Sequence, residues 1–213
     1  MPLVSTIRHG RPSRSSAARR VAAGALAAVF AVALTACAPD PVAEQYLAGD
    51  GKGYISAKFT VIEIEPEDRG EPVAFAGVTE NGDAFDSADI AGDVTVVNFW
   101  YAGCAPCRVE AGDLEEVWQK YSDDDVSFIG INIYDQPDTA KAFAEDYGIT
   151  YPSLIDVDSG DAKLAFARAT PINATPTTLV LDKQGRVAAR IIGQLEGASV
   201  LSTLVKDVLE ESA

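Results

Sequence analysis

Apolar and polar positions follow one another along the chain with the two periods that distinguish strands from helices. A continuous apolar, β-branched run begins at Val94 and ends near Trp100, which is typical of a strand buried on both faces. After this run the apolar spacing becomes helical, and the helix is expected to end near Tyr121. A Cys-x-x-Cys pair, Cys104 and Cys107, therefore lies where a buried strand passes into the first turn of a helix.

The same periods predict the other elements of the folded region. An Asn-Gly dipeptide between two short apolar runs is a strong hairpin signal. The expected elements are a hairpin within 75–85, a short helical or turn segment over 87–91, strands over 126–133, 151–156, 172–181 and 186–192, and helices over 138–147, 161–167 and 197–211. Alternating strands and helices with a terminal hairpin and helix predict an α/β fold, in which helices cover both faces of a mixed central β-sheet.

Residues 1–36 have the pattern of an export signal. A basic segment ends at Arg19-Arg20, and the apolar run from Val21 to Leu34 is too short to span a bilayer comfortably. The small residues before Cys37, in Leu-Thr-Ala-Cys, resemble a bacterial lipobox, whose cysteine is acylated and becomes the first residue after cleavage. The alternative is an ordinary signal peptide with an incidental cysteine. Arg19-Arg20 also leaves a twin-arginine export route open.

Composition divides the remainder into a tether over 37–66 and a folded domain over 67–213. The tether mixes Pro, Gly, Asp and Ala, with 54–64 as a candidate extended segment against the domain. Removing the five arginines before Cys37 from the 17 basic residues leaves 12 against 32 acids, a charge of about −20. Such a protein would repel nucleic acid and gains no attraction from an anionic membrane. A lipid on Cys37 would supply the membrane attachment instead.

The position of the cysteine pair favours reactive thiols. A helix N-terminus presents unpaired N–H groups and the positive end of the helix dipole, which favour a thiolate over a thiol. Pro106 suits the first helical turn, where a backbone N–H has no intrahelical partner. Cys104, nearer the strand end and the solvent, is the expected nucleophile that attacks a disulfide of a partner. Cys107, one turn deeper, is expected to resolve the mixed disulfide.

Three other interpretations of the pair compete with redox chemistry. A structural zinc site needs four ligands, whereas the only histidine, His9, lies in the signal and Cys37 belongs to the lipobox-like segment. A static disulfide across two intervening residues would constrain the unfolded chain little. Two incidental core cysteines fit poorly with a proline between them at a helix start. We therefore expect a redox pair with no metal and no cofactor.

Two motifs resemble the thioredoxin superfamily. The stretch from Phe99 to Arg108 is similar to its active-site motif, and Ala174-Thr175-Pro176-Thr177 is similar to its cis-proline loop. Within the superfamily, Asn98-Phe99-Trp100, the Cys-Arg-x-Glu sequence ending at Glu110 and an inserted region over 131–156 resemble the extracytoplasmic TlpA/ResA/DsbE group. The resemblance covers roughly residues 72–211. It implies a thioredoxin-like fold with an N-terminal β-hairpin and a TlpA-type insertion.

The resemblance also implies roles for individual residues. A Thr175–Pro176 bond in the cis form would leave backbone groups at Thr175 open to dock a substrate chain; the alternative is a trans proline at a strand start. Glu110 lies at i+3 from Cys107 and would tune the thiols and move protons, unless it is a solvated surface acid. Trp100 is expected to form a wall of the site. Gly103 departs from the family pattern, which often has an aromatic residue there, and would leave the nucleophile more open.

The function expected from these features is thiol–disulfide exchange with exported proteins, by an enzyme held outside the cytoplasm on the bacterial cell membrane by its lipid. A membrane redox donor or acceptor would renew the pair. The likeness to ResA suggests reduction, for example of the haem-binding cysteines of apocytochrome c during cytochrome c maturation, whereas the DsbE likeness allows oxidation of folding proteins. A peroxiredoxin-type peroxidase would need a Thr at position 101, which is Tyr101. A non-enzymatic lipoprotein binding module with a thioredoxin fold is a further alternative.

Overall fold

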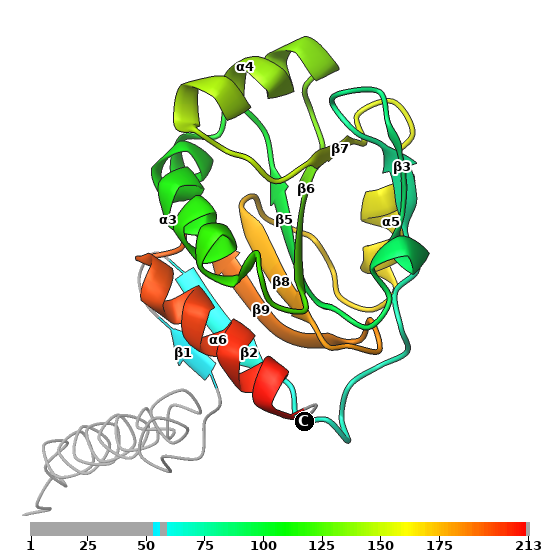
Figure 1. The fold of residues 1–213 in the computed structure, drawn as a ribbon, viewed down its shortest axis with the longest axis vertical. Coiled ribbons are helices and arrows are strands. Elements are labelled where there is room, and N and C mark those ends of the chain that lie inside the picture. Colours follow the sequence, from blue (N-terminus) through cyan, green and yellow to red (C-terminus); the bar gives the residue numbers. More distant parts are fainter. Residues whose placement is uncertain (1–52, 56–58, 212–213) are drawn as a thin grey trace, which may run out of the picture. The chain divides into compact units, whose positions relative to one another are not determined.

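The computed structural model describes residues 53–55 and 59–211, all within one compact unit that spans residues 52–213 (Figure 1). The expected signal over 1–36 and the lipidation site at Cys37 lie outside the described residues. Across 53–55 and 59–211, no helix is long and apolar enough to cross a membrane.

A mixed sheet forms the centre of the unit, as the sequence predicted, and in the part of the chain that the structure describes it has seven strands. Its spatial order is β1-β2-β9-β8-β5-β6-β7, and β5 pairs in parallel with β6 and antiparallel with β8. The parallel pairing continues from β6 to β7, and the remaining neighbours are antiparallel. The strands are β1 (Gly53–Ile55), β2 (Phe59–Glu63), β5 (Val94–Trp100), β6 (Val126–Asn132), β7 (Ser153–Ile155), β8 (Thr177–Leu181) and β9 (Val187–Gly193).

Helices cover both faces of this sheet, which confirms the expected layering (Figure 1). Successive residues of β5 point to opposite faces. Val94 and Val96 pack in the core under α3 and α6, and Val97 and Phe99 pack in a second core with α5. The helices are α3 (Ala105–Tyr121), α4 (Pro137–Tyr147), α5 (Asp161–Ala167) and α6 (Ala198–Glu211).

The sheet begins on the N-terminal side of residue 67, where the sequence placed the start of the domain. Residues Phe59–Glu63 form β2 and pair antiparallel with β9, so that Val61 lies opposite Ile191. Val61 is 4% exposed and belongs to the core under α3 and α6. The candidate extended segment over 54–64 therefore contains two strands of the central sheet, and only the part before residue 53 remains a candidate tether.

A two-stranded hairpin, separate from the central sheet, precedes β5 in the chain. It consists of β3 (Ala76–Val78) and β4 (Ala84–Asp86), joined through the predicted Asn-Gly turn, where Gly82 has a φ of +91°. The 3-10 helix η1 (Ser87–Ile90) follows and leads into β5. The hairpin contacts β7 through backbone bonds, because Glu80 N–H donates to the carbonyl of Ser153 at 2.9 Å.

Candidate active site

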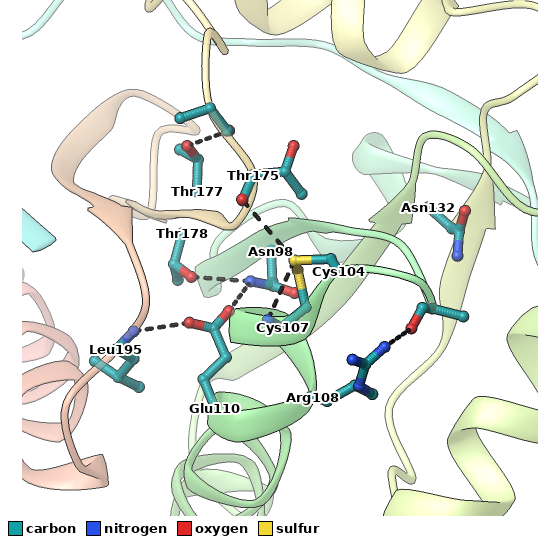
Figure 2. The surroundings of a disulfide bond; sticks show 12 residues. Asn98, Cys104, Cys107, Arg108, Glu110, Asn132, Thr175, Thr177, Thr178 and Leu195 are labelled. Atoms are coloured by element: carbon teal, nitrogen blue, oxygen red, sulfur yellow. Dashed lines mark hydrogen bonds between the residues drawn. A yellow bond between two sulfur atoms is a disulfide. The ribbon is translucent and has the colours of Figure 1, made fainter. Parts of the chain in front are cut away.

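The strand–helix junction places the two cysteines at the N-terminus of α3. A turn closes after β5 when Cys104 N–H donates to the Tyr101 carbonyl at 3.1 Å. Cys104 is the N-cap of α3, and its sulfur accepts the Cys107 N–H at 3.2 Å. A disulfide joins Cys104 and Cys107 (Figure 2). The sulfur expected to be the nucleophile therefore already accepts a hydrogen bond from one of the helix N-terminal N–H groups that favour a thiolate.

The two cysteines are equally buried, which corrects the expectation that Cys104 lies nearer the solvent. Each residue is 3% exposed, and both belong to a cluster that includes Trp100 and Phe143. The Thr175 carbonyl oxygen lies 3.9 Å from Cys104 Sγ, so the proline loop approaches the sulfur from above (Figure 2). For this reason the glycine before Cys104 does not open the disulfide to solvent.

The Thr175–Pro176 bond is cis, as the sequence predicted. The loop is held on both sides of this bond. Thr177 Oγ1 donates to the Ala174 carbonyl at 2.8 Å, and the Pro176 carbonyl accepts the Gly193 N–H at 3.0 Å. The loop that the resemblance assigns to substrate docking therefore contacts the same cysteine that is expected to react.

Glu110 is a buried acid, so its interpretation as a solvated surface group is wrong. Glu110 lies on the helical turn that follows Cys107, and it is 0% exposed. One carboxylate oxygen accepts from Asn98 Nδ2 at 3.1 Å and the other accepts the Leu195 N–H at 2.7 Å. Burial raises its pKa from 4.5 to about 7, although both hydrogen bonds lower the pKa, and the charge of Asp113 adds a small further rise.

Two polar residues of this network, Asn98 and Thr178, were not assigned to the site from sequence. Asn98 Nδ2 also donates to Thr178 Oγ1 at 3.0 Å, which connects Glu110 to the strand that follows the proline loop (Figure 2). A usable signal for Asn98 was present in the sequence. It interrupts an otherwise apolar and β-branched strand, and a buried amide must find hydrogen-bond partners.

Trp100 packs beside the cysteines and is anchored from the opposite side. Its Nε1 donates to Ser153 Oγ at 3.2 Å, and its ring lies 4.4 Å from the Phe143 ring, measured between centroids. Glu80 holds Ser153 in turn, because its carboxylate accepts the Ser153 N–H at 2.8 Å. Strand β7 and helix α4, which lie in the predicted insertion, thus support the indole next to the disulfide.

The region that the structure describes contains no group of three or more His, Cys, Asp or Glu side chains arranged to hold a metal ion.

A small cavity of about 10 Å³ lies next to Cys107 and is lined by Asn98, Trp100, Tyr151 and Ser153 among others. Burial, together with the negative charges of Glu110 and Glu115, raises the pKa of Tyr151, so this phenol stays protonated.

Comparisons with known proteins identify the family. The Redoxin family model matches residues 56–205. The chain is 30% identical over 121 residues to the thiol-disulfide oxidoreductase ResA of Bacillus thuringiensis, covering 54% of this chain and 67% of that protein. It is 37% identical over 112 residues to the thiol:disulfide interchange protein HelX of Rhodobacter capsulatus, covering 52% and 59% respectively.

Solved structures show the same likeness. A DsbF homologue from Corynebacterium diphtheriae has a TM-score of 0.61 and 32% identity, covering 69% of this chain and 92% of that one. A secreted thiol-disulfide isomerase from Corynebacterium glutamicum has a TM-score of 0.63 and 28% identity, covering 70% and 92%. With the Cys104–Cys107 disulfide at the start of α3, these matches show that the chain belongs to the Redoxin family, as a thiol-disulfide oxidoreductase of the thioredoxin superfamily in the TlpA/ResA/DsbE-like group.

Proposed function

We propose that the protein exchanges disulfides with exported proteins, with Cys104 as the nucleophile and Cys107 as the resolving thiol. The observation that supports this assignment is the hydrogen bond from the Cys107 N–H to Cys104 Sγ. A helix N-terminus stabilises a thiolate at that sulfur. In the reductive direction, the Cys104 thiolate attacks a client disulfide and releases one client thiolate. The Cys107 thiolate then attacks Cys104 Sγ, which releases the second client thiolate and leaves the Cys104–Cys107 disulfide.

Glu110 is proposed as the group that tunes these thiols and accepts or supplies protons during exchange. Its pKa of about 7 lies close to the pH at which such a group can do both. When ionised, it places a negative charge on the helix face of Cys107, which disfavours a second anion there. A less stable reduced pair is a stronger reductant, so this acid favours reduction of clients over their oxidation.

Thr175 and Pro176 are proposed to dock the client chain, with Trp100 as a wall of the site. The Thr175 carbonyl already lies against Cys104 Sγ, and an extended client segment that pairs with the Thr175 backbone would bring its own sulfur to the same place. The buried Trp100 ring would keep the cysteine cluster closed to water on the opposite side.

The location proposed for this chemistry is the outer face of the bacterial cell membrane. Residues 1–36 would serve as the signal, Cys37 as the lipidated residue and the segment after it as a tether, on the sequence patterns alone. The likeness to a secreted isomerase supports an extracytoplasmic site. A membrane redox donor would return two electrons to the disulfide after each cycle.

The clients proposed first are disulfides between the haem-binding cysteines of apocytochrome c, in keeping with the resemblance to ResA and with the buried acid. Oxidation of folding exported proteins is the second candidate, because the similar structures include a DsbF homologue and a secreted isomerase. The reduction potential separates these candidates. A value near that of thioredoxin, about −270 mV, would support reduction, and one near that of DsbA, about −120 mV, would support oxidation.

A trapping experiment tests the assigned roles. In cells that express the full chain, Cys107→Ala should accumulate mixed disulfides with exported proteins, because the bond to Cys104 can no longer be resolved. Cys104→Ala should accumulate none, and the double variant is the matched control. Equal trapping by both single variants would contradict the roles, and a fully functional Cys104→Ser, Cys107→Ser double variant would favour a binding module instead.

A further inference from the structure

The two backbone polar groups of Ala102, two residues before Cys104, are each bound by a side chain of opposite charge, the N–H by Asp135 and the carbonyl by Arg108. Asp135 Oδ2 accepts the Ala102 N–H at 2.6 Å. Arg108 Nη1 donates to the Ala102 carbonyl at 3.0 Å, and Figure 2 shows this guanidinium on the side of the cysteines away from Glu110. Hydrogen bonds to charged groups are roughly twice as strong as neutral ones. This turn is therefore fixed more firmly than its own backbone bonds would fix it.

Asp135 is itself held in place before it reaches the turn. Asn132, which is fully buried at the end of β6, donates from Nδ2 to Asp135 Oδ2 at 2.9 Å. The Asn132 Oδ1 accepts the N–H groups of Tyr134 and Asp135 at 3.1 and 2.7 Å. Because β6 pairs with β5, the end of β6 lies beside the end of the strand that leads to the turn. The carboxylate is thus preorganised by a buried amide on the neighbouring strand.

A local structural task does not account for Asp135. It does not cap the following helix, since the N-cap of α4 is Gln136 and makes no side-chain capping bond. Among the hydrogen bonds that Asp135 makes within 59–211, only the one from the Ala102 N–H involves a backbone group outside its own loop. Asp135 thus links the inserted region over 131–156 to the backbone two residues before Cys104.

The turn matters because it decides where Cys104 leaves β5 and enters the N-cap of α3. The Cys104 sulfur lies 3.2 Å from the Cys107 nitrogen, and the effect of a helix N-terminus falls off within its first turn. A shift of the turn would therefore weaken the interaction that favours the thiolate. The ionisable groups in these surroundings are Arg108 and Glu110 on α3, Asp135 and Tyr134 on the loop after β6, and Tyr101, whose ring packs on that of Tyr134.

We propose that Asp135 is a positioning residue for the exchange reaction, which acts through the Ala102 N–H to hold Cys104 Sγ on the N-terminus of α3. This inference rests on the proposed function, because it takes Cys104 to be the nucleophile. Asp135 acts through its hydrogen bond to the Ala102 N–H, which favours the thiolate by fixing the turn. Its negative charge alone would instead disfavour the thiolate and raise the thiol pKa.

The test measures the reduced protein reacting with a small model disulfide, oxidised glutathione, as a function of pH. Asp135→Ala should lower the rate of mixed-disulfide formation at neutral pH about tenfold and raise the apparent thiol pKa, because the charge-assisted bond is lost. Asp135→Asn keeps an acceptor oxygen and should recover most of the rate. Asp138→Asn, an exposed acid on the first turn of α4, is the matched control and should behave as wild type.

Three outcomes would overturn the proposal. If Asp135→Ala and Asp135→Asn both lower the thiol pKa, Asp135 acts only as a nearby charge. If Asp135→Ala lowers the stability to urea but leaves the rate and its pH profile unchanged, the contact is only a structural link. An effect of equal size in Asp138→Asn would assign it to net charge.

Failure of the proposed function would look different from failure of this inference. Wild type and Cys104→Ser are measured under the same conditions. If Cys104→Ser still forms the mixed disulfide, Cys104 is not the nucleophile and the proposed function is wrong. If Cys104→Ser is inactive and the Asp135 variants match wild type, only the positioning role is refuted.

Discussion

Replacing Glu110 by Gln tests the buried acid directly through the pH dependence of stability. The folded protein holds the Glu110 proton up to about pH 7, whereas the unfolded chain releases it near 4.5. The raised folded pKa means that Glu110 favours the folded state at acid pH, and this contribution is lost as the pH rises from 4.5 through 7. The displacement from 4.5 to about 7, at about 1.4 kcal/mol for each pKa unit, corresponds to roughly 3 kcal/mol.

The variant removes this pH dependence and also changes the hydrogen bonding. Glu110 accepts two N–H groups, from Asn98 and Leu195, and a glutamine has one acceptor oxygen for them. One buried donor therefore loses its partner, at a cost of about 1–3 kcal/mol that does not depend on pH. We expect Glu110→Gln to be clearly less stable than wild type at pH 5 and close to it at pH 8.

The measurement is urea unfolding of the oxidised protein between pH 5 and pH 8. The fall in the free energy of unfolding over this range should be smaller in Glu110→Gln than in wild type by up to about 3 kcal/mol. Glu116→Gln makes the same change at an exposed position of the same helix and should leave the fall unaltered. Parallel curves for wild type and Glu110→Gln would refute the raised pKa. The same variant should also shift the thiol titration of the reduced pair, and an unaltered titration would remove Glu110 from the proposed mechanism.

Two further predictions concern the scaffold around the site. Burial raises the pKa of Asp182, but hydrogen bonds from Arg186 and Arg69 and the charge of Arg186 outweigh it and lower the pKa overall. Asp182→Asn should therefore cost about 3 kcal/mol of stability at pH 7. In urea unfolding, the difference from wild type should shrink as the pH falls below 3.8, because the protonated carboxyl no longer stabilises the folded state. An unchanged difference at low pH would contradict this. A Cβ at Gly130 would overlap Ser153 Oγ, so Gly130→Ala should lower the melting temperature and cost about 1–3 kcal/mol. Gly112→Ala, a helical position with open space around it, should instead raise stability by about 0.5–1 kcal/mol, and equal effects of the two changes would count against the clash.

Local patterns were sufficient to predict most elements of the central fold. The β-branched run of β5 and the helical spacing after Cys104 predicted the strand–helix junction, because both periods are properties of a few consecutive residues. The proline loop at Pro176 was predicted with its cis bond from a short motif. The first two strands were harder to recognise. Both are flanked by Pro, Gly and Asp in the sequence, and they belong to the sheet only because β2 pairs with β9 and β1 pairs with β2.

The candidate site divides in the same way. The sequence by itself determined that two thiols lie at a helix N-terminus and that Glu110 shares a helix face with Cys107, since the i+3 spacing is a property of the helix alone. Only the tertiary structure decided that this face is buried, because Leu195 and Thr178 come from segments 85 and 80 residues away from their partners. It also decided that Asp135 reaches the turn before Cys104 and that Cys104 is covered by the proline loop. Solvation sets the pKa of Glu110, and which segment excludes the water depends on the order of strands in the sheet.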